Sequence, residues 1–352
     1  VSRRLVNLAG ALFGRMSGGL ALVATLASTF FGAVSGSAPA TTAAIGGVML
    51  APMAEKGYDK NFAGAVVAAS GTIGLIIPPS LTMVLYGVST GVSIGELFIA
   101  GVIPGIIICI VLMAVEYVIS LRRGYKGDEP ASFKTISRYF RESVFALFMP
   151  VIILGGIYAG VFTPTESAAV AVVYGLIVGI FIHRELTWKD VSKLILKSAK
   201  STALVMYLMV TAEVLTYVLV SEQIPQTIAA SILNISTNAI VVQLIMVFIL
   251  LVVGTFLNNS AAMVLLAPIF YPIIMSLGVD PLFFGIIMVI SLAIGHNTPP
   301  VGLCLFIACD IGNLKLEHLV KEIAPLVAAL IVTVVALNFF PDLILFLPRM
   351  MR

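Results

Sequence analysis

Small polar residues and prolines interrupt the apolar runs of this sequence, and their chemistry is that of ion binding. Residues 291–302 read SLAIGHNTPPVG, so Asn297, Thr298 and a proline pair break an apolar run of membrane length. Each proline removes a backbone donor and clashes with the preceding turn, which costs a helix about 3 kcal/mol. The break frees backbone carbonyls that can coordinate a cation beside the neutral Asn and Thr oxygens, while half-helix N-termini attract anions. These residue types predict a site for a hard cation such as sodium and for an anionic group.

The break has a counterpart earlier in the chain. Residues 57–80 (GYDKNFAGAVVAASGTIGLIIPPS) and 278–301 (GVDPLFFGIIMVISLAIGHNTPPV) align without a gap at an offset of 221, and nine positions are identical. Apolar bias alone does not place Asp, Ser and a Pro-Pro pair in register. The two segments therefore indicate an internal repeat.

A second interruption precedes each copy, at residues 32–42 (GAVSGSAPATT) and 253–263 (VGTFLNNSAAM). The apolar stretches that flank each interruption are about 12–16 residues long, whereas a membrane span needs about 20. This pattern predicts a re-entrant helical hairpin in each copy, with its tip near the middle of the membrane. The alternative is a kinked, closely packed ordinary span, because small residues also favour helix contacts.

Composition sets the broad class of the protein. Hydrophobic residues make up 60% of the 352 residues and charged residues 11%, compared with about 25% charged residues in soluble domains. Long apolar runs predict an all-α polytopic membrane protein whose surroundings are the lipid bilayer, and the short alternating segments of a transmembrane β-barrel are absent. The small net charge of +3 gives no reason to expect a nucleic-acid partner. The three cysteines lack metal-ligand spacing and are expected to be inert.

The placement of basic residues predicts how the copies are oriented. Lys and Arg in short loops face the cytoplasm, and the basic clusters of this sequence fit a topology with five crossings between Asp59 and Asp280. Five is odd, so the two copies are expected to have opposite orientation. Inverted-topology repeats with broken helices are typical of secondary transporters, which bind their substrate near the midplane.

The expected organisation follows from these patterns. The segments are an amphipathic arm helix (1–15); a first repeat (16–121) with hairpin 19–53, broken helix 61–91 and span 97–121; scaffold spans and cytoplasmic loops (122–220), with spans 144–162, 166–182 and 201–220; and a second repeat (221–352) with arm 222–236, hairpin 239–275, broken helix 281–310 and span 323–346. Nothing at the start of the chain pairs with the span at 204–220, so at least one N-terminal span is expected to precede Val1.

Five stretches carry a resemblance to a known family. They are SGSA (35–38), AASGTIGLIIPPS (68–80), YGVSTGVSIGELFIAGVIPG (86–105), GVFTPTESAAVAVVYGL (160–176) and GVDPLFFGIIMVISLAIGHNTPPVGLCLF (278–306). Together they resemble the large membrane subunit of tripartite ATP-independent periplasmic (TRAP) transporters, the DctM/SiaM-like family, over nearly the whole chain.

The resemblance implies a secondary active importer in the cytoplasmic (inner) membrane of a bacterium or archaeon. It implies sodium-coupled uptake of organic anions such as C4-dicarboxylates or sialic acid, by an elevator motion of hairpins and broken helices against a scaffold. The implied partners are a small four-helix membrane subunit and a periplasmic substrate-binding protein, with Na⁺ as coupling ion and no cofactor. It also implies roughly two spans before Val1. The sequence has Thr41 and Asn258 where many relatives carry an acid, which leaves the sodium count and the substrate open.

The candidate substrate and ion site combines the four interruptions. Its residues are Ser35, Gly36 and Ser37 at the first tip; Ser70, Thr72, Gly74, Pro78, Pro79 and Ser80 at the first break; Asn258, Asn259 and Ser260 at the second tip; and Gly295, Asn297, Thr298, Pro299 and Pro300 at the second break. Sodium is expected at the tips and breaks, near Ser37, Thr72, Asn258 and Thr298. The alternative for any single residue is a role as a helix cap or in packing.

Two acids and one histidine have open roles. Ionisable residues in spans are functional candidates, so Glu166 and Glu213 are candidate coupling or scaffold residues. Glu166 follows Pro164 at a helix start, where a negative charge is favourable in any case. For His296, beside the second break, lining of the site or packing is favoured over proton coupling.

Three other functions were weighed against the importer. An autonomous ion-coupled anion carrier that needs no binding protein has the same sequence features. An intramembrane enzyme is disfavoured, because the sequence has no HExxH and no GxSxG with a matching histidine. A channel would need no inverted pair of binding tips.

Overall fold

The computed structural model describes residues 1–351, except 128–130, 224–226, 228–235 and 237. Every regular element among these described residues is a helix. Eight helical stretches in the described chain are long and apolar enough to cross a membrane. The prediction of an all-α polytopic membrane protein is therefore confirmed.

The described chain forms the following helices. They are α1 (Ser2–Phe13), α2 (Gly19–Ser35), α3 (Ala38–Glu55), α4 (Lys60–Gly71), α5 (Ile73–Ile76), α6 (Leu81–Thr90), α7 (Ile94–Arg123), α8 (Phe133–Tyr158), α9 (Pro164–Ile177), the π-helical turn η1 (Val178–Ile182), α10 (Trp188–Ser221), α12 (Ala239–Phe256), α13 (Asn259–Ser276), α14 (Pro281–Gly295), α15 (Leu303–Gly312), α16 (Leu316–Leu337) and α17 (Pro341–Met351).

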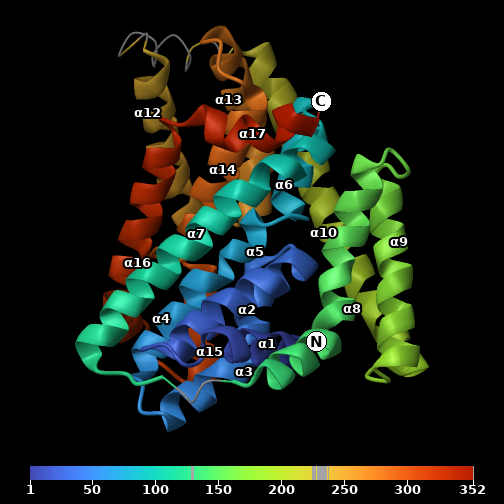
Figure 1. Cartoon of the computed structure of the whole chain (residues 1–352). Helices are drawn as coiled ribbons and strands as arrows, with labels where there is room; N and C mark the ends of the chain where they lie inside the picture. Colours follow the sequence, from blue (N-terminus) through green and yellow to red (C-terminus); the bar gives the residue numbers. More distant parts are fainter. Residues whose placement is uncertain (128–130, 224–226, 228–235, 237, 352) are drawn as a thin grey trace.

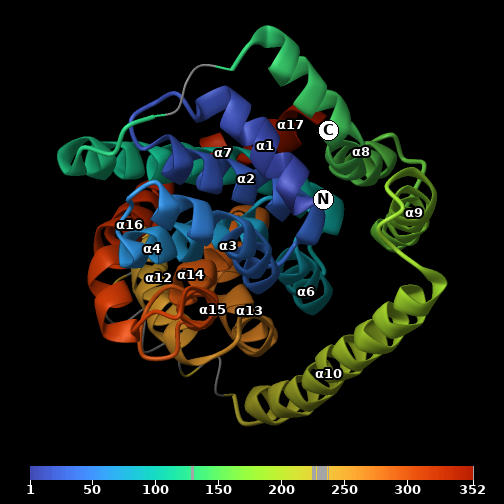
Figure 2. The ribbon, with the colours of Figure 1, turned by 90° about the horizontal axis from the view of Figure 1, so that it is seen from below.

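The molecule consists of a compact body and a set of peripheral helices. In Figure 2, α8, α9 and α10 lie along one side of the body formed by the other helices. The most apolar window of α10 is 0% buried, whereas that of residues 60–90 is 89% buried. The peripheral helices thus have wide apolar faces, which suit lipid or other membrane helices.

Two helical hairpins and two broken helices form the centre of the body. The pair α2–α3 is followed by the broken helix α4–α5–α6, and the pair α12–α13 is followed by the broken helix α14–α15. In Figure 1 the first broken helix rises from α4 to α6, while the second descends from α14 to α15. The two hairpins lie at opposite ends of the same view.

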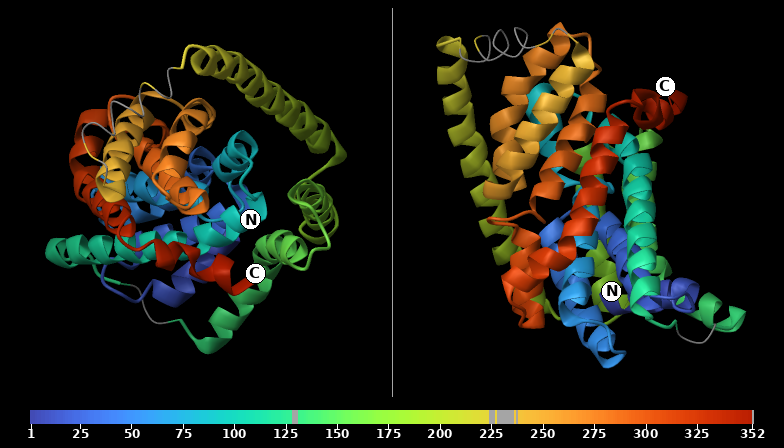
Figure 3. Two further views of the ribbon diagram at one scale, coloured as in Figure 1. Left: turned by 90° about the horizontal axis from the view of Figure 1, so that it is seen from above. Right: turned by 90° about the vertical axis from the view of Figure 1, so that its left-hand side faces the viewer.

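Each half of the body packs against the other in a reciprocal way. Helix α3 of the first hairpin contacts α15, and α13 of the second hairpin contacts α6. Likewise α4 contacts α16, and α14 contacts α7. The two helices that follow the broken helices, α7 and α16, lie side by side (Figure 3). Each broken helix is therefore held by elements of both halves.

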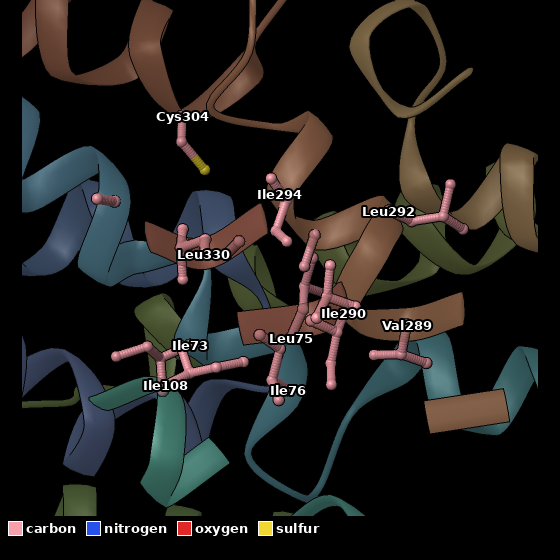
Figure 4. Close-up of a cluster of buried hydrophobic side chains, with 14 of the residues drawn as sticks. Ile73, Leu75, Ile76, Ile108, Val289, Ile290, Leu292, Ile294, Cys304 and Leu330 are labelled. Atoms are coloured by element: carbon pink, nitrogen blue, oxygen red, sulfur yellow. The ribbon is translucent and has the colours of Figure 1, made fainter. Parts of the chain in front are cut away.

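The core lies where the broken helices meet. Figure 4 shows side chains of α5 beside side chains of α14, with Ile108 of α7, Cys304 of α15 and Leu330 of α16 also labelled. The labelled residues are all buried and include Ile73, Leu75, Ile76, Ile108, Val289, Ile290, Leu292, Ile294 and Leu330. This apolar contact keeps the two breaks at fixed positions relative to each other.

Aspartate caps begin both broken helices. The carboxylate Oδ1 of Asp59 accepts hydrogen bonds from the backbone amides two and three residues further on, at 2.9 and 2.9 Å. Asp280 makes the equivalent bonds at 2.8 and 3.3 Å. Each cap satisfies amides that have no partner inside the helix. The identical Asp positions of the repeat thus have a local structural role.

The C-terminal part differs from the expected span at 323–346. Helix α16 begins earlier, at Leu316, and ends at Leu337, and Pro341 begins the separate helix α17. A proline disfavours helical conformation in the residue before it and is well suited to a first helical position. The arm expected at 222–236 falls mostly outside the described residues.

Candidate ion and substrate site

The first hairpin packs directly against the backbone of the first helix break. A Cβ atom added at Gly32 of α2 would lie 2.7 Å from the Cα atom of Gly74. A Cβ added at Gly36 would lie 2.6 Å from the carbonyl oxygen of Pro79, and Gly36 has a positive φ of 62°. Only glycine fits these positions without displacement of the backbone.

The second tip is attached to the second break in the same way. A Cβ added at Gly295 would lie 2.3 Å from the carbonyl carbon of Gly254 in α12. The backbone amide of Val301 donates to the carbonyl of Thr255 at 3.2 Å. In both halves, therefore, a glycine of the hairpin packs on the glycine at the break. We call these contacts the first clamp (Gly32–Gly74) and the second clamp (Gly254–Gly295).

The proline pairs lie in the non-helical connections next to the clamps. The first connection covers residues 77–80 and the second residues 296–302. The Pro78–Pro79 and Pro299–Pro300 peptide bonds are both cis. Non-helical backbone at membrane depth is tolerated where protein buries it or where it lines a polar cavity. The first connection is buried or half-buried throughout, whereas Pro299, Pro300 and Val301 of the second are exposed.

The hydroxyl groups around the first tip bond to one another. Ser35 Oγ lies 2.9 Å from Thr41 Oγ1, and Thr41 Oγ1 donates to the carbonyl oxygen of Ser37 at 2.8 Å. Ser28 of α2 and Ser70 of α4 share a buried hydrogen bond of 2.9 Å. These hydroxyls therefore have partners within the chain, and they fix the tip to its own hairpin and to α4.

Polar side chains around the second tip have no such partners. Asn258 caps α13 by accepting from the amide of Ser260 at 2.9 Å. Asn259, His296 and Asn297 are 2%, 4% and 0% exposed, and none of their polar side-chain atoms has a hydrogen-bond partner in the described residues. Leaving a buried polar group unpaired costs about 1–3 kcal/mol. The region is therefore suited to a polar ligand.

The second tip fits a hard cation by its donor set. The amide oxygens of Asn259 and Asn297 are neutral oxygens with free lone pairs. Thr298 Oγ1 donates to the carbonyl of Ile294 at 3.2 Å, so its own lone pairs stay available. Hard cations prefer oxygen donors of this kind. These residues could hold Na⁺, and the imidazole of His296 beside them could bind a hydrogen-bonding group of a substrate.

A cavity of about 630 Å³ lies between the first tip and the peripheral helices. Ser35, Gly36, Pro79 and Ser80 line it on one side, and α9 lines it on the other. Ser80 is 1% exposed, and its hydroxyl has no partner among the described residues. The structure thus brings four predicted site residues to one cavity. The predicted residues of the second tip and the second break are not among the residues that line this cavity.

The two acids singled out by the sequence lie on the peripheral helices α9 and α10. Glu166 forms a capping box with Thr163: it accepts from the Thr163 amide at 2.8 Å, and its own amide donates to Thr163 Oγ1 at 3.3 Å. Glu213 is exposed on α10. Glu166 therefore caps the start of α9, which agrees with the expectation that a negative charge is favourable at a helix N-terminus.

Sequence reasoning did not single out Gly32, Gly254 or Glu116. Gly32 lies four residues before Gly36 of the first tip, and Gly254 lies four residues before Asn258 of the second tip. This shared spacing could have identified both glycines. Glu116 is a single acid in the apolar run 97–121, where any ionisable residue deserves a role. Its partner is 91 positions away in the sequence, so spacing could not reveal it.

An all-α membrane protein in which polar hairpin tips are clamped to broken helices has the build of a transport permease. The sequence profile of the family described as "Tripartite ATP-independent periplasmic transporter, DctM component" matches residues 1–343. The chain therefore belongs to this family. It is a TRAP transporter large permease of the inner membrane, and not an enzyme.

Relatives across the family show the same similarity. The isethionate TRAP transporter permease protein DctMQ of Oleidesulfovibrio alaskensis is 45% identical over 98% of this chain and 55% of its own length. The C4-dicarboxylate TRAP transporter large permease protein DctM of Pseudomonas aeruginosa is 40% identical over 99% of this chain and 82% of its own. The sialic acid TRAP transporter large permease protein SiaM of Vibrio cholerae is 36% identical, also over 99% and 82%.

Proposed function

We propose that this chain is the transporting subunit of a sodium-coupled importer of organic anions. It receives its substrate from a periplasmic binding protein and works with a small four-helix membrane subunit. Substrate crosses the membrane by an elevator motion. The observation that carries the proposal is the group of buried, unpartnered polar side chains at the second tip, Asn259, His296 and Asn297, beside a broken helix.

Sodium as the coupling ion is supported by the oxygen donors at the tips and breaks. Asn258, Thr298, Ser37 and Thr72 supply neutral oxygens beside backbone carbonyls of the breaks. None of them carries a charge, so a bound cation and a substrate anion together would leave the region nearly neutral. A cation at the tip would also attract the acidic group of a substrate.

The elevator motion is supported by the two clamps and by the reciprocal packing. Because each tip is in backbone contact with its break, the hairpin and the broken helix form one rigid unit. Helices α8, α9 and α10 lie at the periphery, where α8 packs on α2 and α10 packs on α13, and they are candidates for the static part. The opposite directions of the two broken helices in Figure 1 suit an inverted-topology repeat around a midplane site.

The substrate class is taken from the relatives and from the lining of the site. The names of three relatives refer to isethionate, C4-dicarboxylates and sialic acid, which are all organic anions. No arginine is among the residues that line the cavity at the first tip. Recognition of the anion therefore rests on amides, hydroxyls and a bound cation.

The partner subunits are also taken from the family. The word "tripartite" in the family description denotes a three-part system. The similarity to this chain covers only 55% of DctMQ and 57% of SiaT, so these permease proteins have further length outside the matched part. The wide apolar faces of α9 and α10 leave room for a further membrane subunit. An autonomous carrier without a binding protein is the second candidate, because it would use the same tips.

Uptake into proteoliposomes tests both candidates. The full-length subunit with its small partner is supplied with an inward sodium gradient and a panel of labelled dicarboxylates, sugar acids and keto acids, with and without the cognate binding protein. Uptake that needs both sodium and the binding protein is expected. Uptake that ignores the binding protein would favour the autonomous carrier, and uptake that ignores sodium would reject the coupling ion.

Two tip variants test the ion site in the same assay. Asn258→Ala and Ser37→Ala are each expected to raise the sodium concentration for half-maximal uptake by about tenfold, or ~1.4 kcal/mol of ion binding. Unchanged sodium activation in both variants would reject the tips as ion sites. Gly47→Ala is the control, because a Cβ at this exposed helical position meets nothing within 4 Å.

A further inference from the structure

A buried carboxyl group lies outside the site described above, where the first hairpin packs on α7. Glu116, in the C-terminal half of α7, is 0% exposed. The hydroxyl of Thr25 in α2 lies 2.6 Å from one of its carboxyl oxygens and 2.8 Å from the other. Thr25 is also 0% exposed. The contact joins the first arm of the hairpin to the helix that follows the broken helix.

Thr25 can satisfy only a small part of this carboxyl. A hydroxyl group has one proton to donate, whereas an ionised carboxylate offers about four acceptor positions. Ser120, one turn further along α7, has a fully buried hydroxyl that makes no hydrogen bond in the described chain. Among the described side chains, therefore, Thr25 alone donates to this carboxyl, and Ser120 does not.

Charged groups near Glu116 are engaged elsewhere. Helices α2, α5 and α14, which pack against α7, carry no titratable side chain. At the end of α7, Arg123 pairs with Glu322 of α16 at 2.7 Å. On α7 itself Cys109 interacts with Glu116, and α7 also carries Glu96, Tyr117 and Arg122. Helix α6, which packs on α7 as well, carries Tyr86. Within the described residues, no cationic side chain of α4, α8, α16 or α17 contacts the Glu116 carboxyl.

A carboxyl group in such surroundings is stable as the neutral acid. Burial of an ionised carboxylate without a cation or several donors is very costly, and a buried acid binds a proton instead. The neutral acid keeps the hydrogen bond from Thr25 and has an O–H of its own to donate. The site therefore stabilises the proton-bound form as long as α2 is seated on α7.

We propose that Glu116 is a proton-binding site that is loaded while the first hairpin is seated on α7. When α2 separates from α7 and water enters, the carboxylic acid O–H bond breaks, and the proton passes to water as the carboxylate is hydrated. Attachment of the hairpin is then linked to proton binding. This linkage is independent of the ion that drives transport, so it does not depend on the function proposed above.

Infrared spectroscopy of the purified complex in lipid tests the protonation state directly. The spectrum of the wild type at neutral pH is compared with that of Glu116→Gln, which keeps an acceptor for Thr25. Loss of the carbonyl band of a protonated carboxyl group in the variant is the expected result. Glu317→Gln, at an exposed acid in the first turn of α16, is the control and is expected to leave the band in place. An identical band in wild type and Glu116→Gln would overturn the proposal.

A second variant keeps the test decisive if Glu116→Gln does not fold. Thr25→Val removes the hydroxyl and nearly keeps the volume, so the carbonyl band of Glu116 is expected to shift to higher frequency as its hydrogen bond is lost. A band that does not shift would overturn the assignment. The same spectra are recorded in sodium and in choline salts. Disappearance of the band in sodium would show a cation site in place of a proton site.

The pH dependence of thermal unfolding supplies a third readout. Because the folded state holds this proton more tightly than the unfolded chain, the wild type is expected to lose stability as the pH rises, relative to Glu116→Gln. Below the pH at which glutamate titrates in the unfolded chain, the difference between the two melting temperatures is expected to be constant. A difference that is the same at all pH values would contradict a proton site.

Discussion

The two tip-and-break regions share their backbone and differ in their polar side chains. Both have a glycine clamp, a proline pair and an aspartate cap at the start of the broken helix. In the first region the hydroxyls bond to one another, as Ser28 does to Ser70 and Ser35 to Thr41. In the second, the side chains of Asn259, His296 and Asn297 have no partner in the described chain.

This difference distinguishes the residues of the repeat that determine the backbone structure from those whose polar groups could bind a ligand. The duplicated glycines, prolines and aspartates set a tip against a break, and this needs no ligand. The residues that diverged decide whether the polar groups are satisfied by protein or by something bound. Most hydroxyls of the first region are thus satisfied by the protein, with Ser80 and Thr42 as exceptions, whereas the three side chains of the second would gain from a polar ligand.

The largest contrast between the two regions is expected in their sidedness. Single cysteines replacing Lys60, directly after Asp59, and Met275, exposed in the last turn of α13 before Asp280, are expected to label from opposite faces of the membrane. Impermeant maleimide applied to intact and opened vesicles measures this, in a variant without Cys109, Cys304 and Cys309. Labelling of both from the same face would refute the inverted repeat and, with it, the comparison.

The clamps are expected to give the largest change in stability. Gly295→Ala places a methyl group 2.3 Å from the carbonyl carbon of Gly254, and Gly32→Ala places a methyl group 2.7 Å from the Cα atom of Gly74. Overpacking of this kind costs about 1–3 kcal/mol, so both variants should unfold at lower temperature and lose most uptake, with Gly295→Ala the more severe. Gly47→Ala in α3 is the control, because a Cβ atom at this exposed position has no neighbour within 4 Å. Wild-type behaviour of both clamp variants would show that the tips do not need this contact.

Removal of one polar group from each region should have opposite effects. Asn297→Ala removes an amide without a partner, so we expect about tenfold weaker sodium activation, or ~1.4 kcal/mol, and no loss of thermal stability. Ser28→Ala breaks a satisfied hydrogen bond, so we expect about 1 kcal/mol lower stability and a smaller change in sodium activation. Sodium titration of uptake and thermal unfolding measure both. Equal effects of the two variants would remove the distinction between the regions.

The aspartate caps are expected to give the smallest and most similar effects. Asp59→Ala and Asp280→Ala should each lower stability by about 1 kcal/mol, because each leaves two backbone amides without an acceptor. Asn at the same positions keeps an acceptor oxygen and serves as the control. Clearly unequal losses, measured by thermal unfolding, would show that the two broken helices begin in different surroundings.

Sequence alone predicted the local features and missed most of the long-range ones. The proline pairs and the short apolar arms mark the breaks and tips, because proline and length act through the backbone of their own segment. The Gly32–Gly74 contact depends on how α2 meets the break, which spacing within one copy does not reveal. The expected single span at 323–346 is divided in the structure, where α16 ends at Leu337 and α17 begins at Pro341. A proline interrupts a helix even within an apolar run.

The candidate site was predicted as a set of residues but not as an arrangement. Asn259 and Asn297 were named for their residue type, yet only the structure gives their burial and their lack of partners. Ser35 and Ser80 were named together, and the cavity that both line was not foreseen because α9 forms its other wall. Assignment of the ion and the substrate to these residues stays a prediction.

The reciprocal packing of the two halves has a consequence for synthesis in the cell. Helices α3 and α6 enter the membrane early, but the helices that pack on them, α15 (Leu303–Gly312) and α13 (Asn259–Ser276), are made much later. At about 5–20 residues per second, α3 and α6 wait on the order of ten seconds or longer for these partner helices. Until then the first half of the body is held by its own contacts, above all the first clamp.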